Sequence, residues 1–270
     1  MQGGNTFSAS ANITLQSYFC SFSQMIMEHT DWYENWFGSL YYKILYQDRD
    51  ELEAQEFTEH LLNYLQPLPG SGMLDIACGE GRFAIELAEH GYDVTGIDIS
   101  HLSIEKAKAH EHEHLRFFVH DMRFPFYINY FDYAFNFFTS FGYFAHDRDH
   151  VLAAKSFAKA LKKNGILVID YLNKDKVLDN LIPEEVVHRG SYSFHISRRL
   201  ERNHILKTIE FTDADNKPRH YTESVAAFSL SDFIQIFKKA GLSLTGTFGN
   251  YRLGAYDPLT SPRMIMVFKK

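Results

Sequence analysis

Three aspartates lie within or directly after short apolar runs of the sequence and could accept hydrogen bonds from one nucleotide-like ligand. Asp75 lies inside the first run, Asp98 ends the second, and Asp121 follows the third. Apolar runs of this length, separated by helical patterns, predict parallel strands. The carboxyl ends of such strands meet at one edge of a sheet, where folds of this kind bind ligands. We therefore expect the three carboxylates to gather round a single ligand.

A glycine turn, Gly79-Glu-Gly81, separates the first apolar run from a helical pattern that extends to His90. Glycine admits positive φ angles, and its missing side chain lets backbone N–H groups approach a ligand closely. Strand, glycine turn, helix, strand and acid, in this order, form half of a nucleotide-binding α/β unit. An acid at the tip of the second strand can accept hydrogen bonds from both hydroxyls of a ribose.

The layout over about 61–240 resembles the class I S-adenosyl-L-methionine (SAM) methyltransferases, whose first motif is an acid followed by a glycine turn. The resemblance implies that Gly79 and Gly81 pass under the methionine part of SAM. It implies that Asp75 orients the turn or contacts the methionine ammonium group through water. The three acids together are far more specific than the glycine turn alone, which occurs in many α/β proteins.

The second and third predicted strands supply the rest of the implied cofactor site. Asp98 matches the acid that holds the ribose, and Asp121-Met122 matches the motif whose carboxylate accepts from the adenine amino group. A carboxylate suits this position because the exocyclic amine of adenine is a hydrogen-bond donor. The predicted cofactor-binding set also includes Ala77, Ile99 and Phe138. The product of the implied reaction is S-adenosyl-L-homocysteine.

A tyrosine-rich segment, YYKILYQDR, precedes the first strand. It is similar to the element that covers the methionine end of SAM in small-molecule methyltransferases. By that resemblance Arg49 pairs with the SAM carboxylate, and a hydroxyl of Tyr42 or Tyr46 supports the pair. The alternative is a packed amphipathic helix, because large apolar residues recur at four-residue spacing from Trp32 to Ile44.

A second aromatic segment follows the fourth predicted strand, where substrate-facing residues lie in the family. Phe138, Phe141 and Tyr143 could form walls round the transferred methyl group, and Tyr143 or His146 could accept a proton. Tyr143 and His146 are therefore the candidate catalytic residues. Core aromatics and a helix-capping histidine are the alternative interpretation. The DNA-adenine branch of the family has two prolines here that Asn136-Phe-Phe-Thr lacks, which disfavours a nucleobase amine as the acceptor.

Alternating strand and helix patterns around these motifs predict an α/β fold. We expect a Rossmann-like, mainly parallel seven-stranded sheet with helices on both faces. Two helices should precede it, one through the segment that begins at Trp32 and one from a capping box at Asp48 to Leu65. The fifth strand is expected at Ile166–Ile169, after a turn at Asn164-Gly165.

The hydrophobic period changes after the fifth strand. Residues 191–197 alternate between apolar and polar, and two further strands are expected at 203–211 and 219–228. This pattern predicts a small antiparallel insertion, 185–228, over the substrate side. We expect residues 1–28 to be an N-terminal extension or mobile arm. The SAM-binding methyltransferase domain is expected in two pieces, 29–184 and 229–270, and the insertion between them covers 185–228.

Composition and charge narrow the class of protein. The 270 residues have a net charge of −7, which argues against sequence-independent nucleic-acid binding because that needs a basic face. No apolar run approaches the ~18 residues of a membrane span, and no Lys or Arg precedes Lys43, unlike in a signal peptide. Two cysteines suit a reducing cytoplasm. We interpret His110-Glu-His112-Glu-His114 as a solvated helix end and expect no metal.

The predicted function is methyl transfer from SAM to an N or O nucleophile of a small polar molecule. The branch with an antiparallel insertion after the fifth strand includes glycine and amino-sugar N-methyltransferases. The choice between N and O, and a homodimer, stay open. A non-catalytic SAM-binding sensor or subunit is one alternative, and it would need no acceptor cavity. An NAD-dependent oxidoreductase fits Gly79-x-Gly81-x-x-Ala84 but has no use for Asp75 and Asp121.

Overall fold

Two sheets organise the protein, whose computed structural model describes residues 32–47 and 51–270. The central sheet and its helices comprise, in chain order, α4 (Glu51–Leu65), β1 (Gly72–Ile76), α5 (Arg82–Glu89), β2 (Asp93–Asp98), α6 (His101–Ala107), η1 (Lys108–His110), β3 (Leu115–Val119), β4 (Phe131–Asn136), α7 (Asp147–Ala160), β5 (Leu161–Leu172), α9 (Leu230–Lys238), β10 (Ser243–Phe248) and β11 (Arg263–Lys269). The remaining elements are α2 (Trp32–Phe37), α3 (Leu40–Leu45), α8 (Lys174–Asp179), β6 (Glu184–Arg189), β7 (Tyr192–Glu201), β8 (His204–Thr212) and β9 (Pro218–Ala226).

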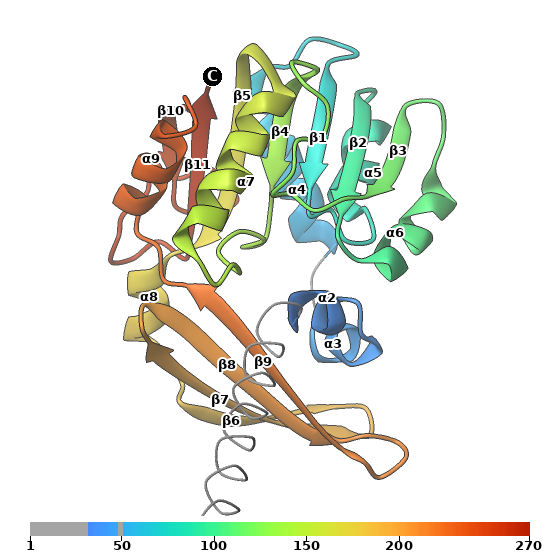
Figure 1. The fold of residues 1–270 in the computed structure, drawn as a ribbon, viewed down its shortest axis with the longest axis vertical. Coiled ribbons are helices and arrows are strands. Elements are labelled where there is room, and N and C mark those ends of the chain that lie inside the picture. The colour runs from blue at the N-terminus through green and yellow to red at the C-terminus, as the bar shows by residue number, and fades with distance from the viewer. Residues whose placement is uncertain (1–31, 48–50) are drawn as a thin grey trace, which may run out of the picture.

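The central sheet has the strand order β10-β11-β5-β4-β1-β2-β3 (Figure 1). Strands β1 to β5 pair in parallel, whereas β11 is antiparallel to both β5 and β10. Strands β2 and β3 are added on one side of β1, and β4 and β5 on the other, so the strand order reverses between β1 and β4. Ligands are expected outside the carboxyl ends of the strands at such a point. The prediction of a Rossmann-like, mainly parallel seven-stranded sheet is confirmed.

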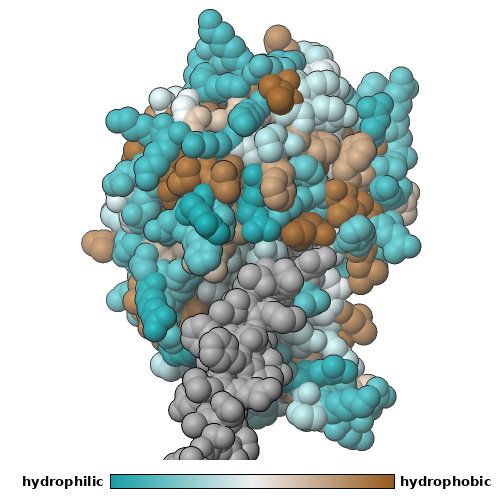
Figure 2. Space-filling view, viewed as in Figure 1, coloured by the Kyte–Doolittle hydropathy of each residue, from teal (hydrophilic) through white to brown (hydrophobic). Residues whose placement is uncertain are grey.

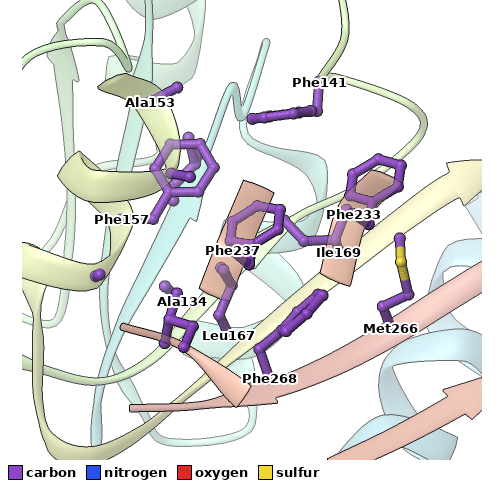
Figure 3. Packing of buried hydrophobic residues seen from close by; sticks show 14 of the residues in the cluster. Ala134, Phe141, Ala153, Phe157, Leu167, Ile169, Phe233, Phe237, Met266 and Phe268 are labelled. Atoms are coloured by element: carbon purple, nitrogen blue, oxygen red, sulfur yellow. The ribbon is translucent and has the colours of Figure 1, made fainter. Parts of the chain in front are cut away.

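Helices cover both faces of this sheet because its strands are apolar on both sides. Phe57 of α4, Leu87 of α5 and Ile104 of α6 belong to the core on one face. Phe157 of α7 and Phe237 of α9 belong to the core on the other face, where Figure 3 shows them packed together over the strands. Burial of these faces is the main favourable free-energy contribution to the fold.

The register of the parallel strands brings the motif residues to one edge of the sheet. Asp75 of β1 pairs with Gly96 of β2 on one side and with Phe135 of β4 on the other. Asp98, the last residue of β2, pairs with Val119, the last residue of β3. The loops that follow β1, β2, β3 and β4 therefore start side by side.

A four-stranded antiparallel sheet, β6-β7-β8-β9, lies beyond the carboxyl edge of the central sheet, and α2 and α3 lie between the two (Figure 1). Trp36 of α2 and Leu45 of α3 are buried against Phe194, Ile209 and Phe211 of the small sheet. Apolar packing therefore attaches the two short helices to the small sheet and holds them over the edge where the motif loops lie.

The prediction of one amphipathic helix from Trp32 to Ile44 is wrong, because the segment forms the two helices α2 and α3. The side chain of Ser39 accepts a hydrogen bond from the backbone N–H of Tyr42 at 3.1 Å and begins the second helix. Leu40, expected on the apolar face, is 64% exposed. Ser39 has an extended backbone, with φ −77° and ψ 150°, which interrupts the helix, so the four-residue spacing does not continue across it.

The small sheet has four strands rather than the three expected. Strand β6 escaped prediction because its sequence, EEVVHR, contains only two apolar residues, and its side chains alternate between exposed and partly buried. Helix α8 was also not predicted. Strand β5 begins at Leu161, before the expected Ile166, and includes the predicted turn at Asn164. The capping box at Asp48 and residues 1–28 lie outside the described residues.

On the face drawn in Figure 2, hydrophobic residues lie in separate groups among hydrophilic ones. Within 32–47 and 51–270, no helix is long and apolar enough to cross a membrane.

Candidate functional site

A cavity of about 420 Å³ lies at the carboxyl edge of the central sheet, between the motif loops and the helices α2 and α3. Of the fourteen residues predicted as catalytic or cofactor-binding, eleven line it, Gly81 and His146 do not, and Arg49 lies outside the described residues. The lining residues used below are Tyr33, Phe37, Tyr42, Lys43, Tyr46, Asp75, Ala77, Gly79, Glu80, Asp98, Ile99, Asp121, Met122, Phe138, Ser140, Tyr143 and Phe144. Residues from five separate segments of the chain thus meet at one concave site.

The glycine turn after β1 has a backbone that ordinary residues rarely adopt. Gly79 has φ +59° and Gly81 has φ +89°, and the preceding Ala77 also has a positive φ of 61°. A Cβ atom added at Gly81 would lie 2.5 Å from the ring of Phe117, whereas one added at Gly79 would meet nothing within 4 Å. Packing against Phe117 therefore requires a glycine at position 81. At position 79 the glycine leaves the backbone open to the cavity.

Asp98 links the glycine turn to the second strand. Its carboxylate accepts hydrogen bonds from the backbone N–H groups of Gly79, at 2.9 Å, and Ser100, at 2.8 Å. Burial raises the pKa of Asp98, and these backbone donors act in the opposite direction. Each oxygen has a further lone pair, so the carboxylate can still accept from a ligand.

Asp75 is the most buried of the three acids, at 2% exposed. Burial, and then the nearby charge of Asp98, raise the pKa of Asp75 to about 7, while the N–H of Ala84 and the charge of Arg82 lower it. Its Oδ2 atom is buried and has no hydrogen-bond partner in the part of the chain that the structure describes. Such an atom is costly unless something pairs with it. A cationic ligand group in the cavity would satisfy it and favour the ionised form.

Asp121 lies at the cavity, but its carboxylate is already engaged. The guanidinium of Arg123 donates to both oxygens, with distances of 3.1 and 2.9 Å from Nε and 2.5 Å from Nη2. The backbone N–H of Arg123 donates to Oδ1 at 2.9 Å. This fork fixes the orientation of the carboxylate. A ligand donor at Asp121 would have to share an oxygen with Arg123.

Tyr42 of α3 and Tyr46, the residue that follows α3, line the cavity, and Arg49 lies outside the described residues. The hydroxyl of Tyr46 donates to Glu223 of β9 at 2.7 Å and accepts from Lys207 of β8 at 2.5 Å. Glu223 also accepts from Nε1 of Trp36 at 2.7 Å. Polar contacts, in addition to apolar packing, therefore connect the cavity wall to the small sheet.

The segment after β4 divides between the cavity and the core. Phe138 and Tyr143 line the cavity. Phe141, expected beside the methyl group, is instead fully buried in the core, where its ring lies 5.7 Å from that of Phe233 (Figure 3). The prediction for Phe141 is wrong because residues 138 and 139 both have positive φ, which breaks the strand period.

The structure does not bring His146 to the cavity. It is exposed, it is not among the lining residues, and it occupies the N-terminal boundary of α7 without a side-chain cap hydrogen bond. Tyr143, by contrast, lies between the cavity and the ring of Trp32, with ring centroids 5.4 Å apart. Of the two candidate catalytic residues, only Tyr143 is positioned to contact a ligand.

Several residues that line the cavity were not predicted from the sequence. Lys43 of α3 forms an ion pair with Glu80 in the glycine turn, and Glu80 also pairs with Lys106 at 3.2 Å. No local pattern indicates a pair that is separated by 37 residues. Tyr33 and Phe37 also line the cavity, and their four-residue spacing was a usable signal.

Comparison with known proteins agrees with the geometry. The family model described as "Methyltransferase domain" matches residues 46–246. The glycine/sarcosine N-methyltransferase of Parasynechococcus marenigrum (strain WH8102) is 28% identical over 188 residues, which cover 66% of this chain and 59% of that protein. The chain spans between 22% and 59% of the length of the curated relatives that it matches.

Solved structures show the same fold at low sequence identity. An S-adenosylmethionine-dependent methyltransferase from Clostridium acetobutylicum ATCC 824 has a TM-score of 0.72 and 17% identity, with 85% of this chain and 96% of that chain covered. SAM-bound CalS10, an amino pentose methyltransferase from Micromonospora echinaspora, has a TM-score of 0.60 and 15% identity, with 83% and 92% covered. The NAD alternative finds no support in these matches. A family model over most of the chain, the shared fold and three acids round one cavity lead to one conclusion: this chain belongs to the class I SAM-dependent methyltransferase family.

Proposed function

We propose that the protein transfers the sulfonium methyl group of SAM to an N or O nucleophile of a small polar molecule. One observation carries the proposal: Asp75, Asp98 and Asp121 line a single cavity together with the glycine turn. An arrangement of three acceptors and exposed backbone matches the donors of an adenosine and an amino-acid ammonium group. Family membership supports the same reaction.

The residues at the cavity fit this cofactor. The unpartnered Oδ2 of Asp75 would meet the ammonium group, and Asp98 would hold the ribose. Asp121 and Met122 would receive the adenine, with Arg123 fixing the carboxylate. The absent side chain at Gly79 leaves room for close approach to the backbone. Ala77, Ile99, Phe138, Tyr42 and Tyr46 would complete the walls.

Bound SAM supplies an electrophilic methyl group on a sulfonium, whose bonding electrons stay with the sulfur when the methyl group leaves. The task of the protein is then to hold the acceptor in line with that methyl group, which makes the encounter effectively intramolecular. Phe37, Tyr143 and Phe144 line the cavity with aromatic rings and limit water there. A dry site favours the loss of charge that accompanies transfer.

The cavity continues from the cofactor-binding acids to Tyr33, Phe37 and Tyr143, which supports an acceptor site over a sensor without one. The relatives named for glycine, sarcosine and amino pentose support a small polar acceptor. A hydroxyl acceptor must lose a proton, whereas an amine must arrive neutral. We assign assistance in that proton transfer to Tyr143, because His146 is exposed and lies off the cavity.

Thermal unfolding with SAM, S-adenosyl-L-homocysteine and NAD tests the cofactor assignment. A ligand at 100 times its dissociation constant should stabilise the protein by about 2.7 kcal/mol. Asp98→Ala should abolish the response to SAM, and Asp93→Ala, at the opposite end of the same strand, should keep it. Stabilisation by NAD without stabilisation by SAM would refute the proposal.

Formation of S-adenosyl-L-homocysteine with a panel of small amines, hydroxy compounds and amino sugars tests the reaction. With an active acceptor, Tyr143→Phe should change the pH–rate profile, and His146→Ala should leave it as in the wild type. A protein that binds SAM tightly but turns over with no acceptor in the panel would favour the sensor alternative.

A further inference from the structure

The loop that follows β4 forms part of the cavity wall through a backbone conformation that is rare for its residues. Phe138 and Ser140 line the cavity, and Thr139 between them does not. Phe138 has φ 54° and Thr139 has φ 61°. A β-branched residue with positive φ is an outlier that persists only where its surroundings impose it. The surroundings of Thr139 therefore need an explanation.

Asp170, near the end of β5, holds the backbone of both left-handed residues. Its side chain is 0% exposed, and its carboxylate accepts from the backbone N–H of Phe138 at 2.9 Å. The carbonyl of Asp170 accepts from the backbone N–H of Thr139, also at 2.9 Å. The hydroxyl of Tyr251 donates to the same carboxylate at 3.1 Å. One residue of the neighbouring strand thus binds two consecutive amides of the loop.

Arg263, the first residue of β11, connects this carboxylate to the side chain of Thr139. Its Nε donates to Asp170 at 2.8 Å, and its Nη2 donates to the Thr139 hydroxyl oxygen at 3.0 Å. That oxygen also accepts from the backbone N–H of Leu172 at 3.0 Å. A guanidinium can bridge two acceptors in this way because its donors form a rigid fork.

We propose that Asp170, Arg263 and Thr139 form a positioning unit that fixes Phe138 and Ser140 in the cavity wall and so sets the affinity for SAM. None of the three lines the cavity, so they act through the loop rather than by touching the cofactor. The ring of Phe138 transmits the constraint, since the guanidinium of Arg82 lies 4.6 Å from its centroid and the ring of Phe83 lies 5.4 Å away. The inference rests on the proposed placement of SAM against Phe138.

Two substitutions at one position separate positioning from mere folding. Thr139→Val keeps the β-branched shape and removes the hydroxyl, whereas Thr139→Ser keeps the hydroxyl. By titration calorimetry at a temperature well below unfolding, we expect Thr139→Val to bind SAM and S-adenosyl-L-homocysteine about tenfold more weakly, because Arg263 and the N–H of Leu172 lose their acceptor and hold the loop less firmly. Thr139→Ser should bind within about twofold of the wild type, since its hydroxyl can still receive Arg263.

Phe268→Leu is the matched control for lost stability. Phe268 is 0% exposed in the core of the central sheet and pairs with Leu167 of β5, away from the carboxyl edge (Figure 3). It should lower the unfolding temperature and leave the dissociation constant for SAM unchanged. If Thr139→Val does not fold, Arg263→Lys replaces it. Lysine keeps the charge beside Asp170 but cannot bridge to Thr139 with a fork of donors, so SAM binding should again weaken.

The outcomes distinguish this proposal from the proposed function. Weaker SAM binding in Thr139→Val or Arg263→Lys, with normal binding in Thr139→Ser and Phe268→Leu, supports the positioning unit. Normal SAM binding in the folded Thr139→Val, together with loss of binding in Asp98→Ala, overturns the positioning unit and leaves the cofactor site in place. Normal binding in Asp98→Ala overturns both.

Discussion

The buried carboxyl of Asp75 makes SAM binding depend on pH, and the dependence can be worked out from the structure. The pKa of Asp75 is raised from 3.8 to about 7, first by burial and then by the charge of Asp98. In the apoprotein, Asp75 therefore keeps its proton up to about pH 7, whereas the unfolded chain releases it near pH 4. A cation beside Asp75 stabilises the ionised form. SAM should thus bind preferentially to the deprotonated protein.

The size of the effect follows from the ionised fraction of Asp75. With a pKa of about 7, that fraction is roughly 0.09 at pH 6.0 and roughly 0.76 at pH 7.5, so SAM should bind about eightfold more tightly at pH 7.5. Calorimetry in two buffers of different ionisation enthalpy should also detect proton release below pH 7. Asp75→Asn should bind SAM weakly and with little pH dependence.

The free energy of unfolding of the apoprotein should fall as pH rises, whereas the affinity for SAM should increase. A carboxyl with a raised folded pKa contributes stability that is complete below pH 4 and is lost as pH rises through about 7. At roughly 1.36 kcal/mol per pH unit, the loss amounts to about 4 kcal/mol. Asp75→Asn, which cannot ionise, should therefore unfold at a higher temperature than the wild-type apoprotein at pH 7.5. Equal affinity of the wild type for SAM at pH 6.0 and 7.5, or an Asp75→Asn apoprotein less stable than the wild type at pH 7.5, would refute the reasoning.

Three further predictions concern the site and its supports. Gly81→Ala should destabilise the fold strongly, because its Cβ would lie 2.5 Å from Phe117, whereas Gly79→Ala should cost about 1 kcal/mol in urea unfolding yet weaken SAM binding. His150 is buried with a pKa lowered to about 4 by desolvation, so stability should fall by about 3 kcal/mol as pH drops from 6.5 to 4, and His150→Phe should lessen that fall in urea titrations at pH 7 and 4.5. Glu223→Ala leaves two donors without their acceptor and should cost about 1–3 kcal/mol in the same assay, with Glu223→Gln in between; no change in either variant would show that the contacts contribute nothing.

The central sheet was predictable because local sequence determines it. The apolar runs that form β1 to β4 are short and bounded by turn residues, and those of β1 and β4 are largely buried, so strand type and order follow from the pattern. The acids of the cofactor site were predictable for the same reason: each lies at or just beyond the carboxyl end of a strand, and parallel strands end together. Asp75, Asp98 and Asp121 all line the cavity as expected.

Features that depend on distant residues were not predictable. In the sequence FFTSFGY, nothing local shows that Phe138 faces the cavity and Phe141 the core. The orientation of both rings depends on the positive φ angles of residues 138 and 139. Asp170, 32 positions from Phe138, and Arg263, 124 positions from Thr139, hold this backbone in place. The edge strand β6 was not predicted for another reason. It buries little apolar surface, so its sequence shows only a weak alternation of apolar and polar residues.

Two kinds of unfavourable feature occur at the cavity or directly beside it. Ala77, Phe138 and Thr139 have left-handed backbones, and Asp75 is a buried carboxyl whose Oδ2 has no hydrogen-bond partner among the described residues. Such features cost stability and persist only where something supports them. The two kinds of feature differ in how they are supported. The left-handed loop is held by Asp170 within the protein, whereas Oδ2 of Asp75 has no hydrogen-bond partner among the described residues and needs the ligand. Binding of a cationic cofactor should therefore stabilise the ionised carboxylate of Asp75 and leave the backbone of the left-handed loop unchanged.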